Sequence, residues 1–200
     1  MRLYMVRHGQ TAANRDGFFY DDTQNIPLTE VGQQQAMNIR PILEKIPFDR
    51  VYSSDYLRAI QTQQIALPDA KDPIRTPLLR EISAGWLGGK PYSFVYDNIE
   101  QYNGWTPTGD NRGYKDFGGE SMEMVGVRLR QFLRELEENP CDRVVAFAHG
   151  AVMACLLRVV VEADDFCRGS VLSANCAIHV FDYDGTRWKL IAWNYGVPLD

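Results

Sequence analysis

Two histidines occupy equivalent positions in the sequence, each at the end of an apolar run and directly before a glycine. His8 follows residues 3–6 and Arg7, and His149 follows residues 144–148. In an open parallel α/β sheet, ligands bind beyond the carboxyl ends of the strands, and a glycine there permits a tight turn. We therefore expect both imidazoles in one crevice, where an imidazole can act as a nucleophile or carry a proton.

Two arginines near these histidines carry the charge that chemistry at phosphorus requires. Arg7 adjoins His8, and Arg58 lies in the first turns of a predicted helix just beyond a predicted strand. A phosphoryl group is negative throughout its transfer, and a planar guanidinium binds two of its oxygens at once. Taken alone, Arg58 fits an ordinary exposed helix cation. Together with the two histidines, the arginines predict phosphoryl transfer with His8 as the nucleophile.

The segments that carry these residues alternate between strand patterns and helix patterns. Short apolar runs predict buried strands at residues 3–6, 50–53 and 142–148. Apolar positions at helical spacing predict helices over residues 30–46, 57–67, 121–138 and 151–161. Thr29 is the expected N-cap of the first helix, and Ser54 or Asp55 that of the second. This alternation is typical of an α/β fold with a largely parallel sheet.

Two further regions complete the pattern. From about residue 85 to residue 117 the sequence is rich in glycine, proline, asparagine and aromatic residues, which predicts a loop-rich insertion with a short helix near 93–99. Alternation over residues 177–183 and 186–193, around Asp184 and Gly185, predicts a β-hairpin closed by a type I′ turn. The third histidine, His179, lies in this hairpin, and we expect a structural or surface position for it.

Composition excludes several classes of protein. The chain has 200 residues, of which 45% are hydrophobic and 24% charged, as expected of one globular domain. A net charge of −5 argues against a nucleic-acid-binding face, which needs clustered lysine and arginine. No apolar stretch reaches the roughly 18 residues that cross a membrane, and the N-terminus meets Arg7 too early for a secretory leader.

The cysteines point to a reducing compartment. None of them shows the paired spacing of a metal site such as Cys-x-x-Cys; they are Cys141, Cys155, Cys167 and Cys176. We therefore expect reduced thiols in a cytoplasmic protein.

Six segments, in this order along the chain, resemble the motifs of the histidine phosphatase (phosphoglycerate-mutase-like) superfamily. They are Arg7-His8-Gly9-Gln10-Thr11-Ala12-Ala13-Asn14, Leu28-Thr29-Glu30-Val31-Gly32 with Gln35-Ala36, Ser53-Ser54 with Leu57-Arg58-Ala59 and Thr62, Leu79-Arg80-Glu81-Ile82, Gly118-Gly119-Glu120-Ser121, and Ala148-His149-Gly150. The resemblance implies one domain over residues 1–200. Its expected fold is a three-layer α/β/α sandwich with a mostly parallel central sheet, an insertion at about 85–117 over the active site and a C-terminal β-hairpin.

The resemblance also implies roles for individual residues. His8 matches the histidine that is phosphorylated in this family. Arg7, Arg58 and His149 match residues that bind the phosphoryl group, and Glu81 matches the residue that acts as acid and then as base.

Further positions match the substrate-binding part of the family's site. Asn14 matches a residue near the phosphate, and the backbone of Gly150 and Ala151 matches a segment that lines the pocket. A helix that begins there directs N–H groups toward an anion, which is independent support for this match.

Chemistry then dictates the state of each group. The attacking nitrogen of His8 must be unprotonated, which a backbone hydrogen bond to the other ring nitrogen and the repulsion from nearby arginines both favour. Glu81, held protonated by partial burial, supplies a proton to the leaving oxygen and then, as a carboxylate, activates water. Because arginine and histidine take the electrostatic role, we expect no metal and no cofactor.

Three functions remain open, of which hydrolysis of a small phosphate ester is the leading one. A cofactor-dependent phosphoglycerate mutase is less favoured for three reasons. Ala151 and Val152 follow His149-Gly150 where mutases carry Asn-Ser, residues 82–86 differ from the mutase motif, and the chain is shorter than a typical mutase. The third function is a noncatalytic protein that binds phosphorylated ligands through the same pocket.

The insertion suggests the class of ester. Residues 85–117 contain three cations and four anions together with many aromatic residues, including Trp86, Tyr92 and Tyr114. An aromatic mouth favours a partly apolar or ring-containing ester, of nucleotide or ribazole type, over a polyanion such as a bisphosphate. The small phosphate ester is the expected partner, with neither nucleic acid nor membrane, and the oligomeric state is left open.

Overall fold

A computed structural model of the chain describes residues 1–20, 25–97, 113–163 and 171–197. Within these ranges it contains one sheet of six strands: β1 (Arg2–Arg7), β2 (Arg50–Ser54), β3 (Ile74–Thr76), β4 (Arg143–Ala148), β5 (Ile178–Tyr183) and β6 (Trp188–Tyr195). The α-helices of the same ranges are α1 (Ala12–Asp16), α2 (Glu30–Leu43), α3 (Leu57–Ala66), α4 (Ser93–Tyr96), α5 (Met122–Glu138) and α6 (Gly150–Val160). Single 3₁₀ turns lie at Pro77–Leu79, Gly85–Leu87 and Lys115–Phe117.

The strand order is β3-β2-β4-β1-β5-β6. Strands β3, β2, β4 and β1 run parallel to one another, whereas β5 is antiparallel to β1 and β6 is antiparallel to β5. The sheet is therefore mostly parallel, as predicted, and the predicted C-terminal hairpin forms its antiparallel edge.

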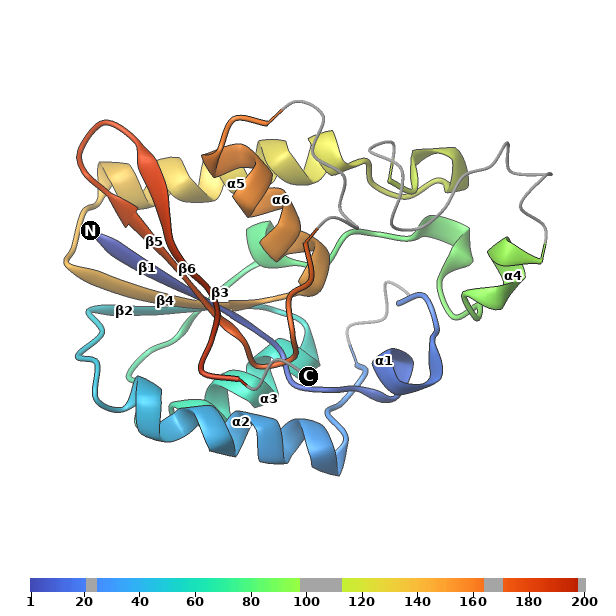
Figure 1. Cartoon of the computed structure of the whole chain (residues 1–200), viewed down its shortest axis with the longest axis horizontal. Helices are drawn as coiled ribbons and strands as arrows, with labels where there is room; N and C mark the ends of the chain where they lie inside the picture. Colours follow the sequence, from blue (N-terminus) through green and yellow to red (C-terminus); the bar gives the residue numbers. More distant parts are fainter. Residues whose placement is uncertain (21–24, 98–112, 164–170, 198–200) are drawn as a thin grey trace.

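Helices cover both faces of the sheet, which confirms the predicted sandwich. In Figure 1, α2 and α3 lie on one face, and α5 and α6 lie on the other. Each face has its own apolar cluster: Ile39 and Leu43 of α2 belong to one, and Leu129 and Phe132 of α5 to the other. The side chains of β4 alternate between the two clusters, so this strand is buried on both faces and reads in the sequence as an unbroken apolar run.

The predicted cap of α3 is wrong. This helix begins at Leu57, and Tyr56 is its N-cap residue without a side-chain hydrogen bond. The Ser54 hydroxyl is hydrogen-bonded to His149 instead, and Asp55 pairs with Arg80. Asp55 thus serves a tertiary contact, and Ser54 combines one with a hydrogen bond of 3.3 Å from the N–H of Tyr56, ahead of the first helical turn. The cap of α2 is as predicted, because Thr29 Oγ1 accepts a hydrogen bond from the Gly32 N–H.

The turn of the hairpin also differs from the prediction. Tyr183 pairs with Trp188, so four residues form the connection, and Asp184 does not take the positive φ that a type I′ turn requires. Its carboxylate instead accepts hydrogen bonds from the backbone N–H groups of Thr186 and Arg187. A side-chain-stabilised turn has replaced the two-residue turn.

Other boundaries shift by a few residues, and some elements carried no sequence pattern. Helix α2 ends at Leu43 rather than near residue 46, and neither β3 nor α1 was predicted. The predicted insertion contains α4 and two of the 3₁₀ turns. Its residues 98–112, which include Tyr102 and Trp105, lie outside the described residues, as does Cys167. No helix of the described chain is long and apolar enough to span a membrane.

The turn after β1 and the first turn of α2 approach each other more closely than side chains allow. A Cβ atom added to Gly32 would lie 2.1 Å from the carbonyl oxygen of Gln10, and one added to Gly9 would lie 2.4 Å from the carbonyl oxygen of Gly32. The approach is reinforced by a hydrogen bond of 2.9 Å from the Thr29 N–H to the Gln10 carbonyl. These glycines therefore hold α2 against the segment that follows His8.

We predict that Gly32→Ala lowers the free energy of unfolding by about 1–3 kcal/mol, because the backbone of Gln10 must move to admit the methyl group. Gly126→Ala is the matched control, since Gly126 is also a buried helical glycine but its added Cβ would meet no atom closer than 3.5 Å. That variant should gain about 0.5–1 kcal/mol from helix propensity. Urea unfolding of both variants checks the pair, and equal changes would contradict the close approach.

Candidate active site

The sheet brings the two histidines of the sequence prediction together. Strands β1 and β4 are parallel neighbours with Arg7 opposite Ala148, so His8 and His149 follow at the same level. The His8 N–H donates to the Ala148 carbonyl over 3.0 Å, and the imidazole centroids lie 5.2 Å apart. Both side chains are fully buried.

The hydrogen bonds of His8 define its tautomer. Its Nδ1 lies 2.7 Å from the carbonyl oxygen of Gly9, which can only accept, so Nδ1 carries the proton. Its Nε2 is buried and has no hydrogen-bond partner within the described residues. Burial, followed by the positive charges of Arg58 and Arg7, lowers the pKa of His8 well below its ordinary value. The ring is therefore neutral, with an unprotonated nitrogen available to an electrophile, as expected from the sequence.

The two arginines lie beside these rings. Arg58 is fully buried, which excludes the exposed helix cation. Its guanidinium carbon lies 3.9 Å from the centroid of Tyr20 and 4.9 Å from that of Tyr56, within the range of cation–π attraction. Arg7 donates from Nη1 to the carbonyl of Ser173, and its guanidinium packs on Gly150, where an added Cβ would lie 3.3 Å away.

His149 is held by the last residue of β2. Its Nε2 lies 2.8 Å from Ser54 Oγ, whereas its Nδ1 is buried without a hydrogen-bond partner in the described part of the chain. Burial and then the charge of Arg58 lower the pKa of His149 well below its ordinary value. The site thus contains two neutral imidazoles next to two guanidinium groups.

Glu81 and Asn14 lie on the wall of a cavity beside these residues. The Glu81 carboxylate accepts a hydrogen bond of 3.2 Å from the Ala151 N–H, in the first turn of α6, and one of 3.0 Å from its neighbour Ile82. The group that this helix N-terminus binds is therefore the Glu81 carboxyl itself. The oxygen of the Asn14 amide accepts from Thr11 and Asn175, while its NH₂ group makes no hydrogen bond within the described residues.

Four contributors to the site were not predicted from the sequence: Tyr20, Tyr56, Ser173 and Asn175. Ser173 and Asn175 lie more than 160 residues from the groups they bind, Arg7 and His8. No local pattern marks them beyond a short polar loop ahead of an apolar strand. The two tyrosines are ordinary aromatic residues in the sequence, and their role becomes visible only through their contact with Arg58.

The cavity has a volume of about 210 Å³, and most of the described residues that line it are aromatic or aliphatic. Its apolar and aromatic lining residues are Phe19, Tyr20, Ile82, Ala84, Tyr92, Tyr114, Ala151, Val171 and Leu172. Arg7 is the one cation among the described residues that line it. Tyr92 and Tyr114 come from the predicted insertion, which therefore contributes to the wall of the site as expected.

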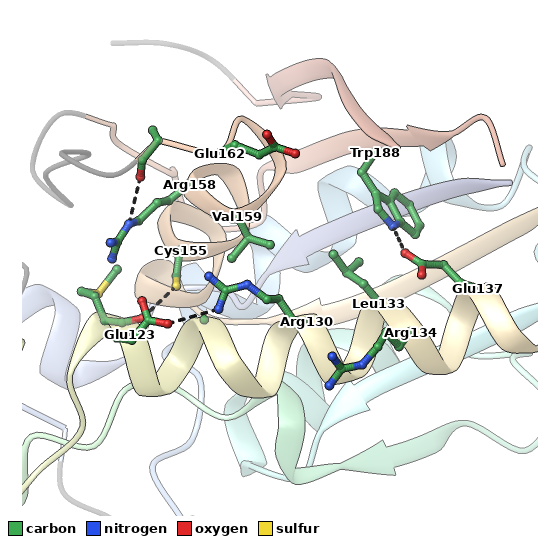
Figure 2. A pocket seen from close by; sticks show the side chains of 13 residues that line it. Glu123, Arg130, Leu133, Arg134, Glu137, Cys155, Arg158, Val159, Glu162 and Trp188 are labelled. Atoms are coloured by element: carbon green, nitrogen blue, oxygen red, sulfur yellow. Dashed lines mark hydrogen bonds and ion pairs between the residues drawn. The ribbon is translucent and has the colours of Figure 1, made fainter. Parts of the chain in front are cut away.

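A second cavity, of about 460 Å³, lies between α5 and α6 and reaches Trp188 of β6. Figure 2 shows that charged side chains line it, with Arg130 paired to Glu123 and the Trp188 indole bonded to Glu137. Its lining contains three arginines and three glutamates, so the charges balance. This cavity therefore offers no excess of positive charge to a phosphate.

The described residues contain no group of three histidine, cysteine or acidic side chains placed to hold a metal ion.

A family model described as "Histidine phosphatase superfamily (branch 1)" matches residues 3–196. The chain belongs to the histidine phosphatase superfamily. This confirms the resemblance of the sequence motifs.

Relatives within this superfamily include both phosphatases and mutases. The chain is 29% identical over 199 residues to a probable phosphoglycerate mutase, GpmB, of Enterobacter sp., with 96% of this chain and 90% of the relative covered. It is 30% identical over 160 residues to the adenosylcobalamin/alpha-ribazole phosphatase of Escherichia coli, with 78% of this chain and 77% of the relative covered.

Solved structures show the same histidine phosphatase fold. A mycobacterial glucosyl-3-phosphoglycerate phosphatase, solved in complex with VO3, superposes with a TM-score of 0.83 at 26% identity and covers 96% of this chain and 98% of its own. The mixed sheet with helices on both sides is therefore the superfamily's architecture.

We predict that acidification destabilises the protein through its buried histidines. In the unfolded chain each histidine binds a proton near pH 6.5, whereas the lowered pKa of folded His8 keeps its ring neutral. Its contribution to stability is thus present above about pH 6.5 and is lost as the pH falls. As the pH falls below about 6.5, the free energy of unfolding of His8→Gln should therefore decrease less steeply than that of the parent chain. The difference between the two slopes should be up to about 1.4 kcal/mol per pH unit. Urea unfolding at several pH values measures both slopes, and equal slopes would contradict a neutral, buried His8.

Proposed function

We propose that this chain is a metal-independent phosphomonoesterase that hydrolyses a small cytoplasmic phosphate ester through a phosphohistidine on His8. The observation that carries the proposal is the unprotonated Nε2 of a neutral imidazole beside two guanidinium groups. A nucleophile and the charge that stabilises a phosphoryl group are thus present together. Residues 1–200 are proposed to form one catalytic domain, and the free thiols of Cys141, Cys155 and Cys176 fit a cytoplasmic location.

The chemistry divides into two transfers. In the first, Nε2 of His8 attacks phosphorus, the bond to the ester oxygen breaks, and that oxygen takes a proton from Glu81. In the second, water attacks the phosphohistidine, the Glu81 carboxylate takes a proton from the water, and phosphate leaves as the N–P bond breaks. The Gly9 carbonyl, which accepts from Nδ1, stabilises the positive charge on the phosphorylated ring.

The other site residues bind the phosphoryl group. Arg7 and Arg58 provide the donors and the charge for its oxygens, and His149 contributes a ring nitrogen. Asn14 has a free NH₂ group on the cavity wall, and Gly150 admits the Arg7 guanidinium. The backbone of Ala151 positions Glu81.

Access to His8 requires a movement of Tyr20. His8 and Arg58 are fully buried, whereas Tyr20 lines the cavity and also contacts both of them. The Tyr20 hydroxyl is tied to Thr11 Oγ1 by a hydrogen bond of 2.7 Å. We infer that the substrate phosphate takes the place of the Tyr20 ring on Arg58.

The residues of the cavity wall favour phosphatase activity over phosphoglycerate mutase activity. A phosphoglycerate mutase must hold a carboxylate and a phosphate together, which calls for cations beyond those of the phosphoryl site. Among the described lining residues, Arg7 is the one cation, and the remainder of the wall is mainly aromatic and aliphatic. Ala151, in the segment where mutases carry Asn-Ser, adds no polar side chain. The likeness to a probable phosphoglycerate mutase makes the mutase the second candidate.

We predict that the protein hydrolyses p-nitrophenyl phosphate in EDTA and that His8→Ala lowers kcat/KM by at least about a thousandfold, because the nucleophile is lost. Acid-labile phosphohistidine should accumulate on the parent chain during turnover and be absent from the variant. Gln34→Ala, on the exposed face of α2, is the control and should keep full activity.

The same preparation distinguishes the other two functions. Rapid isomerisation of 3-phosphoglycerate in the presence of 2,3-bisphosphoglycerate, with little hydrolysis, would establish a mutase. Phosphate binding with neither activity would establish a binding protein. Activity that EDTA abolishes would refute metal independence.

The wall also predicts the kind of ester. Tyr92 lines the cavity and packs edge-on against Phe19, with ring centroids 4.7 Å apart. Tyr92→Ala should raise KM for 1-naphthyl phosphate about fivefold to tenfold through loss of aromatic contact, and should leave KM for phosphoserine within about twofold. Tyr92→Phe, which keeps the ring, should behave as the parent chain. A preference of the parent chain for compact polyanions would overturn this substrate class.

A further inference from the structure

The loop of residues 171–177, which leads into β5, connects the candidate site to the C-terminal hairpin. Val171, Leu172 and Ser173 of this loop line the cavity beside His8. On its other side the loop is bound by residues of β5 and β6, which lie outside the cavity. The loop is therefore placed to transmit the geometry of the hairpin to the site.

A bulge in β6 aims one side chain at this loop. The pairing of β5 with β6 shifts register between Ile178 and Val180, and Asn194 has a φ of 54°. Such a backbone conformation is strained for a residue other than glycine, and bulges next to active sites commonly redirect a side chain. Here the Asn194 amide accepts from the Ala174 N–H over 3.1 Å and donates to the Leu172 carbonyl over 2.9 Å.

His179, on β5, makes the contact that leads to the site. The Asn194 N–H donates to its Nδ1 over 3.3 Å, so the proton of the neutral ring lies on Nε2. Nε2 then donates to Ser173 Oγ over 2.8 Å. Burial lowers the pKa of His179 to about 3, and the ring lies 3.8 Å from that of Trp193. Of the two positions expected for His179, structural or on the surface, the structural one is confirmed, because its side chain is buried.

On the side of the site, the loop binds three residues of the phosphoryl pocket. The Ser173 carbonyl accepts from Nη1 of Arg7. The Asn175 amide donates to the carbonyl of His8 over 2.8 Å and lies 3.4 Å from the Asn14 side chain. The chain His179–Ser173–Arg7 therefore joins the hairpin to the cation that flanks the nucleophile.

We propose that His179 is a positioning residue. It holds Ser173 in place through the hydrogen bond to Oγ, and the carbonyl of Ser173 then sets the direction of the Arg7 guanidinium. Arg7 packs on Gly150 on one side, and its remaining freedom is a rotation that the Ser173 carbonyl restricts. A guanidinium held in one orientation binds two phosphate oxygens without first losing side-chain entropy. This inference rests on the proposed function for its catalytic meaning, and its test uses phosphate binding, which needs no turnover.

The experiment is a double-mutant cycle between His179 and Arg7, read by isothermal titration with inorganic phosphate. His179→Phe keeps an aromatic ring beside Trp193 but loses both hydrogen bonds, and should weaken phosphate binding about tenfold. In an Arg7→Ala background the same change should have an effect of less than about twofold, because the group it positions is absent. An equal loss in both backgrounds would overturn the proposal.

Two controls separate positioning from general damage. His179→Gln keeps a donor near Nε2 and should return phosphate affinity to within about threefold of the parent chain. Trp188→Phe removes the hydrogen bond to Glu137 at the other end of the same hairpin and should leave phosphate affinity unchanged. Equal weakening by His179→Gln and His179→Phe, or weakening by Trp188→Phe, would show that hairpin stability rather than the His179 hydrogen bond matters.

A variant of Ser173 provides the same test if circular dichroism shows that His179→Phe is unfolded. Ser173→Ala removes the same hydrogen bond and leaves the carbonyl that binds Arg7, and it should weaken phosphate binding by a similar factor. Unchanged affinity in Ser173→Ala would overturn the proposal. A parent chain that binds phosphate and shows this coupling but hydrolyses no ester would refute the proposed function while leaving the positioning role in place.

Discussion

The hydrogen bond from Nδ1 of His8 to the Gly9 carbonyl is the interaction on which the rest of the site depends. It places the proton on one ring nitrogen and leaves the other unprotonated, so a backbone conformation determines which nitrogen can serve as the proposed nucleophile. That conformation is fixed from two sides: the Gly9 N–H donates to Thr62 of α3, and Gly9 lies against Gly32 of α2. The reactivity of one nitrogen thus depends on the packing of β1 against two helices.

Burial of the imidazoles beside guanidinium groups imposes a second constraint. Desolvation and the charges of Arg58 and Arg7 both oppose protonation of His8, and His149 experiences the same field. The positive potential that keeps these rings neutral is also the potential that would attract a phosphate dianion, and it is strong because water is excluded. In the proposed reaction, one arrangement of charge would therefore prepare the nucleophile and bind its electrophile, at the expense of stability at low pH.

The sequence predicted those features that depend on short-range patterns and failed where tertiary partners compete for a side chain. The apolar runs before His8 and His149 placed both residues at the same sheet edge, because parallel strands end together. Ser54 and Asp55 looked like helix caps, but His149 and Arg80 bind them in the folded chain. Tyr20 and Ser173 carried no signal, since their role arises from contacts with Arg58 and Arg7 that are remote in sequence.

The residues around His8 are common to hydrolysis and to phosphoryl return, because both reactions pass through the same phosphohistidine. The fate of that intermediate is decided by what the cavity holds beside it: water, or a second hydroxyl positioned by its own anionic group. Among the described residues, the wall is built mainly from aromatic and aliphatic side chains, such as Tyr92, Tyr114 and Leu172, and its one cation, Arg7, belongs to the proposed phosphoryl site. Under the proposed function, specificity and reaction outcome would therefore depend on the insertion and on residues 171–173 before β5, rather than on the strand ends that carry His8 and His149.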